Sequence, residues 1–228
     1  MQQHIAIAID GPAGAGKSTI AKAIAQRLGA RYLDTGALYR AMALFAKRNG
    51  VEPGDGAALE ALAQSADIRV AFTQRGQRVF LGEEDVTESL RTPEISMGAS
   101  AVGAHPWVRV KLTQLMRQVA EEYPVVMEGR DITTNVLPHT PYKFFVTASP
   151  EERAKRRLKE FSAKPGNQET YETVLADILK RDHDDSSRAF MPLRIAPDAT
   201  VVDTTGKSVQ EVLGEMVEAI TQKRGAEA

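Results

Sequence analysis

The sequence predicts an α/β fold in which an open, mostly parallel β-sheet is covered by helices on both faces. Short runs that are apolar on both faces, such as "HIAIAID" at residues 4–10, are typical of strands buried in a parallel sheet. Amphipathic stretches with helical spacing separate these runs, so strands and helices alternate along the chain. The 228 residues, of which 43% are hydrophobic, suffice for a single domain over 1–228 with a sizeable core.

The first half of the chain is expected to begin with two strand–helix units. The apolar residues of the stretch 18–28 recur at helical spacing, and Gly29 stands where a helix commonly ends. The run "ARYLD" is a second strand candidate, and it leads into another amphipathic stretch. We therefore expect strands at 4–10 and 30–34 and helices at 18–28, 37–48 and 57–65.

Residues 67–92 break this alternation. Ile68, Val70 and Phe72 alternate with Arg69 and Ala71, which is the two-residue period of a strand. The following "TQRGQR" has turn character, and "VFLGEEDVT" comes after it. We interpret the segment as a small antiparallel β insertion that does not belong to the main sheet.

The second half is expected to return to alternating helices and strands. Pro106 opens a long amphipathic helix, and the runs "PVVMEGRD", "YKFFVTAS" and "ATVVDTT" are typical of core strands. Two capping boxes are predicted at helix starts, one pairing Ser149 with Glu152 and the other pairing Ser208 with Glu211. A further helix is expected from residue 171 to 183 or beyond.

The residues after the first strand fit the phosphate-binding pattern G-x-x-x-x-G-K-[ST], the P-loop of NTPase-type sheets. Glycines let the backbone wrap a phosphate chain, Lys17 can reach the outer phosphates, and the Ser18 hydroxyl can join the shell of Mg²⁺. The alternative is a chance glycine loop, and the strand before the motif and the helix after it argue against that. The predicted ATP-phosphate site comprises Gly11, Pro12, Ala13, Gly14, Ala15, Gly16, Lys17, Ser18 and Thr19.

The P-loop alone leaves GTPases, ATPases and small-molecule kinases open. The stretch "DTTG" at 203–206 superficially matches a GTPase switch, but it lies near the C-terminus and no Asn-Lys-x-Asp guanine signature is present. The simpler interpretation is a loop that leaves the last strand. By analogy with similar folds, that loop can lie beside the adenine of ATP.

Polar residues follow two further predicted strands. Arg130 and Asp131 come directly after "PVVM", and Asp34, Thr35 and Arg40 come after "RYL". Ligands of open α/β sheets bind at the carboxyl ends of the strands, so we expect these residues to line a site beside the P-loop. Taken singly, each has a plain alternative, such as Thr35 acting as a helix N-cap while Arg40 is merely exposed.

A predicted helix over 174–188 carries a stripe that changes character along its length. Val174, Ile178, Arg181, Asp185 and Arg188 share one face, which is apolar at first and charged at its end. Such a face can leave the core and enter a cleft. The alternative is a solvated helix end with a surface ion pair of small energetic value. The run "DHDD" at 182–185 is a weaker candidate for a metal site.

This arginine-rich arrangement suits a phosphate acceptor. An acceptor hydroxyl needs a base, whereas a phosphate monoester is mostly dianionic at neutral pH and needs cancellation of charge repulsion. Arginines supply that cancellation, and no base is evident. The segment with Arg153, Arg156 and Arg157 can act as a short lid over about 153–170 that excludes water. Its alternative is an exposed basic helix face with a flexible tail.

Composition bears on the expected partners and cellular location of the protein. The net charge is −1, which gives no general reason to expect nucleic acid or an anionic membrane as partner. The chain has no cysteine, no apolar run of about 20 residues and no secretory signal at its start. We therefore expect a cytoplasmic protein with small-molecule substrates, and a monomer.

Taken together, the motifs are similar to those of bacterial cytidylate kinases, a branch of the nucleoside monophosphate kinases. The resemblance covers nearly the whole chain and includes the β insertion. It rests on "IAIDGPAGAGKST", "LDTGALYRA", "SAVGAHPWVR", "EGRDI", "ASPEERAKRR", "RDHDDSSRAFMPL" and "DATVVDTT".

The resemblance implies phosphorylation of CMP and dCMP by ATP with Mg²⁺, and it implies roles for individual residues. The region 34–100 would bind the monophosphate. Around the CMP phosphate it places Thr35, Arg40, Arg130 and Arg181. For the cytosine it implies Ser100, Arg109, Asp131 and Arg188, with Asp185 at the ribose and Asp34 supporting the "DTG" turn. Near the transferred phosphoryl group it implies Lys17, Arg130, Arg153, Arg157 and Arg181, and at Mg²⁺ it implies Ser18.

The sequence departs from the family pattern at a few places. Glu128 stands where the family usually has Asp, "TTNVLPHT" replaces residues like "GTVVFPDA", and "AFMPL" is bulkier than the usual "AVAPL". Arg130 and Asp131 are retained, so the departures concern local packing more than function. Two rival interpretations stay open, a P-loop kinase for another acceptor such as UMP or shikimate, and a non-catalytic ATP-dependent binding module.

Overall fold

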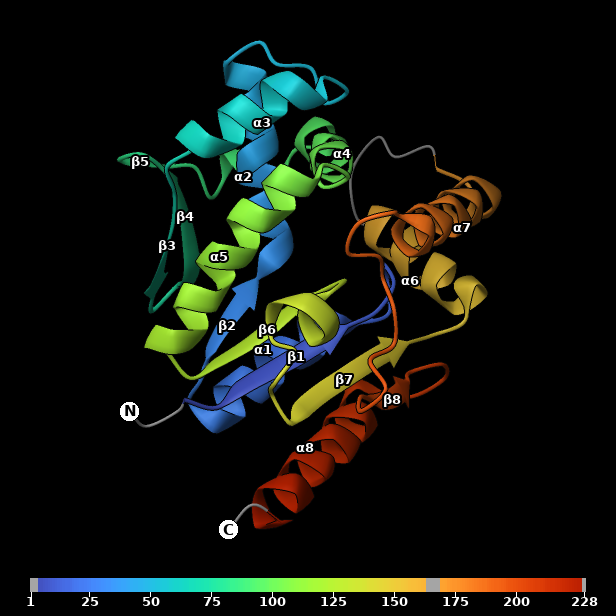
Figure 1. Ribbon diagram of the computed structural model, residues 1–228. Helices are drawn as coiled ribbons and strands as arrows, with labels where there is room; N and C mark the ends of the chain where they lie inside the picture. The colour runs from blue at the N-terminus through green and yellow to red at the C-terminus, as the bar shows by residue number, and fades with distance from the viewer. Residues whose placement is uncertain (1–3, 163–168, 227–228) are drawn as a thin grey trace. The chain divides into compact units, whose positions relative to one another are not determined.

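The computed structural model describes residues 4–162 and 169–226. The chain divides into two compact units, which are described separately. The first unit comprises residues 1–5 and 31–125, and the second comprises 6–30 and 126–228. The main sheet has five strands in the order β2-β6-β1-β7-β8, and a second sheet has three strands in the order β3-β4-β5 (Figure 1). The predicted α/β class with a mostly parallel sheet is thus confirmed.

The second unit holds the core strands of the main sheet. These strands are β1 (Ala6–Asp10), β6 (Val125–Gly129), β7 (Tyr142–Thr147) and β8 (Thr200–Asp203). β7 pairs in parallel with both β1 and β8, with Ile7 opposite Tyr142 and Phe144 opposite Thr200. The apolar side chains of β1 and β6 are almost entirely buried, as expected for strands inside a parallel sheet.

The helices of this unit follow from local patterns. They are α1 (Lys17–Leu28), α6 (Pro150–Ser162), α7 (Tyr171–Ser187) and α8 (Val209–Ala226), with a π-helical turn, η2, at Ile132–Val136. α1 ends at Gly29 in the left-handed conformation with φ 63°, as the sequence predicts. α6 and α7 pack on each other around a small apolar core of Ala154, Val174 and Ile178.

The first unit contains the predicted β insertion. Its elements are β2 (Arg31–Asp34), α2 (Thr35–Arg48), α3 (Gly56–Ser65), β3 (Ile68–Thr73), β4 (Gly76–Leu81), β5 (Glu84–Asp85), the 3-10 turn η1 (Ser89–Arg91), α4 (Pro93–Val102) and α5 (Pro106–Glu122). β3 and β4 form an antiparallel hairpin with Ile68 opposite Leu81. The sequence analysis did not predict α4, although Thr92 caps it and Pro93 occupies its first turn.

Three local points are corrected or decided by the structure. The alternative in which Thr35 caps α2 is excluded, because the N-cap is Asp34, whose side chain accepts the N–H of Ala37. The capping box at Ser149 is half formed, since the Ser149 hydroxyl accepts the N–H of Glu152 while the Glu152 carboxylate bonds Arg156.

The third point concerns the charged stripe. α7 ends at Ser187, so Arg188 lies just beyond the helix and not on it. By contrast, the box between Ser208 and Glu211 closes in both directions, as predicted. The predicted lid over 153–170 is described only in part, because residues 163–168 lie outside the described residues. Within the described ranges, every helix is too short or too polar to cross a membrane.

Candidate functional site

The P-loop connects the end of β1 to the start of α1, and its backbone shape requires glycine. Gly11, Gly14 and Gly16 have φ values of 147°, 78° and 88°, a region that other residues rarely adopt. A Cβ atom on Gly11 would also lie 1.9 Å from the carbonyl oxygen of Val146. The loop therefore holds a shape that fits a chain of phosphates beside a helix N-terminus.

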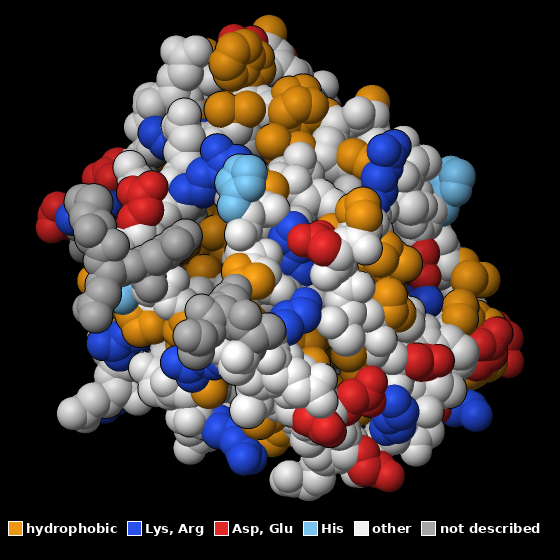
Figure 2. Space-filling view, turned by 60° about the horizontal axis from the view of Figure 1, so that its bottom comes forward, with side chains coloured by type: hydrophobic (Ala, Val, Ile, Leu, Met, Phe, Trp, Pro, Cys, Tyr) orange, Lys and Arg blue, Asp and Glu red, His pale blue; other side chains and the backbone are white. Residues whose placement is uncertain are grey.

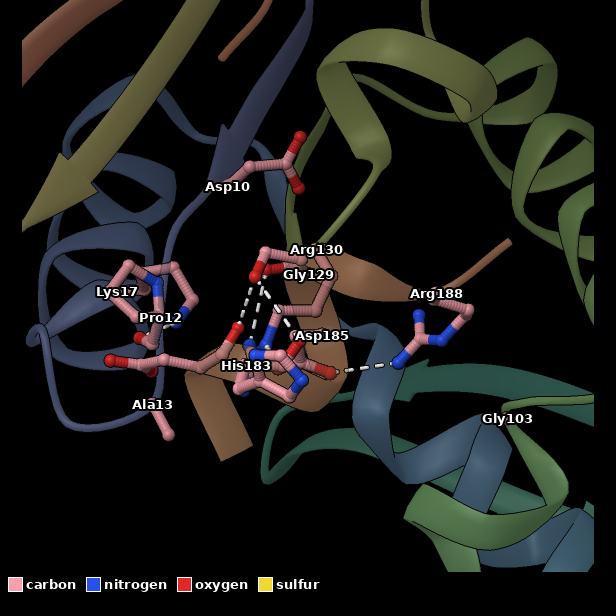
Figure 3. A network of polar contacts seen from close by, with 12 residues as sticks. Asp10, Pro12, Ala13, Lys17, Gly103, Gly129, Arg130, His183, Asp185 and Arg188 are labelled. Atoms are coloured by element: carbon pink, nitrogen blue, oxygen red, sulfur yellow. Dashed lines mark hydrogen bonds and ion pairs between the residues drawn. The ribbon is translucent and has the colours of Figure 1, made fainter. Parts of the chain in front are cut away.

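Lys17 is the buried cation of this loop. Its side chain is 5% exposed, and Nζ donates a hydrogen bond of 2.7 Å to the carbonyl oxygen of Pro12 (Figure 3). Burial lowers the pKa of Lys17 to about 7, and repulsion from Arg130 adds to this, while Glu128 and other nearby carboxylates oppose it. A bound polyphosphate would favour the charged form, so Lys17 is arranged to respond to an anion.

Ser18 is the candidate ligand of the P-loop for a divalent cation. Ser18 is exposed at the first turn of α1, where its hydroxyl can serve as one ligand. Among the residues that the structure describes, no group of three or more His, Cys, Asp or Glu could hold a metal ion. The Ser18 hydroxyl is the group of this loop that could join the shell of Mg²⁺.

Asp10 is a functional candidate that the sequence analysis missed. This last residue of β1 is fully buried, and burial raises its pKa to about 6. Its carboxylate accepts hydrogen bonds from the N–H of Ile132 at 2.9 Å and from the N–H and hydroxyl of Thr133 at 2.7 and 2.6 Å. Asp10 therefore joins the root of the P-loop to the turn that directly follows Arg130. An acidic residue ending a buried apolar strand was the available signal.

Three charged side chains of the second unit form an ion-pair network. Asp185 accepts a hydrogen bond from Nε of Arg130 at 2.6 Å and another from Nη2 of Arg188 at 2.8 Å (Figure 3). Burial favours the neutral acid, but the two guanidinium groups outweigh it and lower the pKa of Asp185. Arg188 Nη1 is buried and finds no hydrogen-bond partner within residues 4–162 and 169–226, so a ligand that reached it would satisfy a buried donor.

Arg181 adds further positive charge to this network. Burial lowers its pKa, and repulsion from Arg157 and Arg130 lowers it further. The guanidinium of Arg157 also lies 4.9 Å from the centroid of the Phe161 ring. Several arginines thus share one region of the second unit with Lys17 and Asp185, a distribution that an incoming anion would stabilise.

Arg153 and Arg156 on α6 are engaged with the protein. Arg153 is 3% exposed and forms a bidentate pair with Asp182, and Arg156 donates to Thr204 and Glu152. The structure therefore agrees neither with an exposed basic face nor with a free arginine at position 153. The predicted contact between Arg153 and the transferred phosphoryl group stays untested.

In the first unit, Asp34 organises the turn after β2. Its carboxylate caps α2 and accepts a hydrogen bond of 2.7 Å from Nη2 of Arg40, so Arg40 is not merely exposed. The side chain of Gln77 in the β insertion pairs with the backbone of Asp34 at both N–H and C=O. The sequence analysis missed Gln77, because its partner is 43 positions away. Thr35 is buried beside the cap.

The remaining predicted residues divide between the units. Arg109 of α5 is buried, donates to the carbonyl oxygen of Gly103 at 2.9 Å and lies over the ring of Tyr39 at 5.4 Å. Ser100 is exposed on α4, and Asp131 is buried in the second unit. Each unit therefore gathers its own share of the predicted acceptor residues. The first holds Asp34, Thr35, Arg40, Ser100 and Arg109, and the second holds Arg130, Asp131, Arg181, Asp185 and Arg188.

Comparison with known proteins gives a consistent family. Residues 7–222 match the family model described as cytidylate kinase. A cytidylate kinase of Mycobacterium leprae is 48% identical over 223 residues, covering 97% of this chain and 98% of the relative. A cytidylate kinase of Bacillus subtilis is 46% identical, covering 98% and 99%. A solved structure of an uncharacterized protein from Eubacterium ventriosum aligns with a TM-score of 0.54 at 12% identity, covering 96% and 99%, and shares the fold.

Proposed function

Because the chain belongs to the cytidylate kinase family, we propose that it transfers the γ-phosphoryl group of ATP to CMP or dCMP. An oxygen of the acceptor phosphate forms the new bond to the γ-phosphorus, and the bond from that phosphorus to the β,γ-bridging oxygen breaks. The products are ADP and CDP or dCDP. One observation carries the proposal, namely that the second unit holds both the glycine-shaped P-loop with its buried Lys17 and the ion-pair network of Arg130, Asp185 and Arg188. Donor and acceptor groups thus occur together in one compact unit.

On the donor side, the residues Gly11 to Thr19 bind the phosphates of ATP. Backbone N–H groups and the N-terminus of α1 bind the anionic chain, and Lys17 leaves the Pro12 carbonyl oxygen to meet the outer phosphates. Mg²⁺, when bound, neutralises charge that develops on the phosphate oxygens. Ser18 is the residue that would contribute to its shell.

On the acceptor side, arginines replace the base that an alcohol would need. The acceptor phosphate is already mostly dianionic, since its second pKa is about 6. Arg130 and Arg181 cancel its repulsion against the incoming phosphoryl group, with Arg157 as a further candidate. Thr35 and Arg40 contribute from the first unit, where Asp34 fixes the direction of Arg40.

Base and sugar recognition is assigned to the polar residues that remain. Arg188 has a buried donor available at Nη1, which suits the carbonyl oxygen or ring nitrogen of a cytosine. Asp131, Ser100 and Arg109 are proposed to read the same base. Asp185 is proposed to bind the ribose while it orients Arg130 and Arg188.

An acceptor panel tests the proposal and separates its rivals. ADP release from ATP is followed by a coupled assay in the presence of CMP, dCMP, UMP and shikimate. We expect strong stimulation by CMP and dCMP, because a buried polar site can reject a mismatched analogue by up to ~10⁴-fold or more. Stimulation by shikimate or UMP alone would favour another small-molecule kinase. Tight ATP binding without transfer to any acceptor would favour a non-catalytic module.

We propose that the enzyme works in the cytoplasm as a monomer, without nucleic acid or membrane as partner. The net charge of −1 and the absence of cysteine support this setting. On the face drawn in Figure 2, basic and acidic side chains are interspersed and not gathered by sign. Light scattering would test the monomeric state, and a salt-dependent DNA-binding assay would test the absence of a nucleic-acid partner.

A further inference from the structure

We propose that Arg153 and Asp182 form a brace that holds the P-loop in its phosphate-binding shape. In this role Arg153 is a positioning residue and does not contact the transferred phosphoryl group. The inference deepens the proposed function and rests on it for the identity of the donor. Its test relies first on nucleotide binding, which can be measured without turnover.

The first observation is that the guanidinium of Arg153 is fully engaged. Nε donates to the carbonyl oxygen of Ala148 at 2.9 Å, and Nη1 donates to the carbonyl oxygen of Ala13 at 3.2 Å. Nη1 and Nη2 form the bidentate pair with Asp182 at 3.0 and 2.6 Å. Arg153 is 3% exposed and Asp182 is 26% exposed, so moving Arg153 to a phosphate would break four hydrogen bonds and leave a partly buried carboxylate without its partner.

The second observation is that α6 packs directly on the loop at the same place. A Cβ atom on Gly14 would lie 3.2 Å from Cβ of Arg153 and 3.5 Å from its carbonyl oxygen. Glycine at position 14 therefore serves the contact with Arg153 as well as the positive φ of 78°. The backbone of Arg153 and its guanidinium hold adjacent residues of the loop.

The third observation is a parallel contact one turn further along α6. Arg156 donates to the hydroxyl of Thr204 at 2.9 Å and to its carbonyl oxygen at 2.7 Å. The Thr204 hydroxyl in turn donates to the carbonyl oxygen of Ala15 at 3.2 Å. Two arginines three positions apart, and so on one helix face, thus secure two alternate carbonyl groups of the P-loop, one directly and one through threonine.

Peptide geometry explains what this arrangement achieves. In a planar trans peptide the C=O and the following N–H point in opposite directions. Fixing the carbonyl oxygens of Ala13 and Ala15 therefore also fixes the N–H groups of Gly14 and Gly16, which point away from the bonded side. These N–H groups are the ones that a phosphate-binding loop presents to its ligand. The brace thus sets the direction of the donors before a nucleotide binds.

Asp182 makes the brace testable separately from Arg153. Asp182→Asn removes one member without touching the arginine, and Arg153→Lys removes the fork that spans the carboxylate and Ala13. Asp184→Asn is the matched control, because Asp184 lies on the same helix in an exposed pair with Lys180 at 2.6 Å. ADP affinity is measured by calorimetry, and kcat and KM are measured with ATP and CMP.

The brace predicts that Asp182→Asn and Arg153→Lys each weaken ADP binding by about tenfold or more, since small displacements of binding groups are costly. In the double variant, the loss of ADP affinity should not exceed the larger loss seen in the two single variants, because both substitutions remove one shared interaction. The control should stay within about twofold of the unmodified protein. Thr204→Val tests the parallel contact without changing Arg153, and we expect a smaller loss of ADP affinity in the same direction.

Two outcomes would overturn the inference. Unchanged ADP affinity in the brace variants would refute it, and Thr204→Val supplies this readout if Asp182→Asn does not fold. The second outcome is a fall in kcat for Arg153→Lys while both variants keep their ADP affinity and Asp182→Asn keeps its kcat. That result would instead assign Arg153 to the transferred phosphoryl group. Loss of ADP affinity in a protein that never phosphorylates CMP would support the brace and refute only the proposed acceptor.

Discussion

The loop after β1 and the turn after β2 both carry polar groups to which we assign a phosphate, but the two are held in different ways. The P-loop is held by side chains from distant segments, since Arg153 bonds Ala13 and Thr204 bonds Ala15. In the turn after β2, the side chain of Asp34 caps α2 and pairs with Arg40, and Gln77 of the β insertion holds the Asp34 backbone. The P-loop is therefore held only by distant side chains in these contacts, whereas the turn combines one distant partner with side-chain contacts of its own residues.

The P-loop is also more deeply buried than the turn after β2. Lys17 is 5% exposed and has a lowered pKa, whereas the side chains of Arg40 and Asp34 are 27% and 34% exposed. A half-exposed ion pair contributes about 1 kcal/mol or less to stability, and it can rearrange at little cost. We infer that the donor loop is preorganised, and that Arg40 is directed by Asp34 through an ion pair that costs less to rearrange than the buried contacts of the P-loop.

The largest expected effect comes from Gly11→Ala. The added methyl would lie 1.9 Å from the Val146 carbonyl oxygen at a φ of 147°, so we expect loss of the folded protein or destabilisation by roughly 3 kcal/mol or more. Gly206→Ala is the control, because Gly206 has φ 69° but no atom within 4 Å of an added Cβ. Urea unfolding compares the two. Similar losses of about 1 kcal/mol at both positions would show that φ alone matters and that the loop is not held by close packing.

Arg130→Ala should affect turnover more than any other change in the arginine network. We expect kcat to fall about 10²–10³-fold with ATP affinity within a few-fold, because the role that we propose for Arg130 is at the acceptor phosphate and the transition state. Steady-state kinetics and nucleotide calorimetry check this, with the exposed Arg224→Ala as control. Equal losses in kcat and in ATP affinity would place Arg130 in the donor site or in folding.

Asp34→Ala tests the turn after β2. Losing the cap of α2 should cost about 1–2 kcal/mol of stability, and the loss of the Arg40 partner should raise KM for CMP. Asp55→Ala is matched, since Asp55 caps α3 at 3.0 Å and has no assigned role in binding. We expect a similar stability cost there with KM unchanged. A rise in KM in both variants would mean that helix capping alone accounts for the effect.

The smallest effect is a proton taken up on nucleotide binding. Lys17 has a pKa of about 7 in the free protein, so at pH 8.5 it is mostly neutral. Bound phosphates favour its charged form and raise this pKa, so ADP binding should take up a fraction of a proton, approaching about one. Calorimetry in two buffers of different ionisation enthalpy measures the uptake. The Lys17→Met variant should show none, and an unmodified protein without uptake would contradict a neutral buried lysine.

Features with local causes could be predicted from the sequence. The strands of the main sheet, the P-loop, the β insertion and the closed capping box at Ser208 follow from periodicity and from neighbouring residues. The N-cap of α2 was left open by the sequence, because both Asp34 and Thr35 are competent N-caps and only the geometry of the turn decides between them.

Features with distant causes could not be predicted. Gln77 reaches Asp34 across 43 positions, Thr133 reaches Asp10 across 123, and Thr204 reaches Ala15 across 189. No local pattern marks such a partner, and a buried polar residue finds it only when the chain is folded. The same reason explains Arg153, whose sequence context suggested a lid while its partner Asp182 lies on another helix.

One measurement tests the central claim most directly, namely the rate of ADP release from ATP and Mg²⁺ as a function of added CMP. A preorganised donor loop facing an arginine-lined acceptor site predicts little release without acceptor, and strong, saturable stimulation by CMP with one CDP formed per ADP. The absence of stimulation by CMP, dCMP and UMP alike would contradict the account.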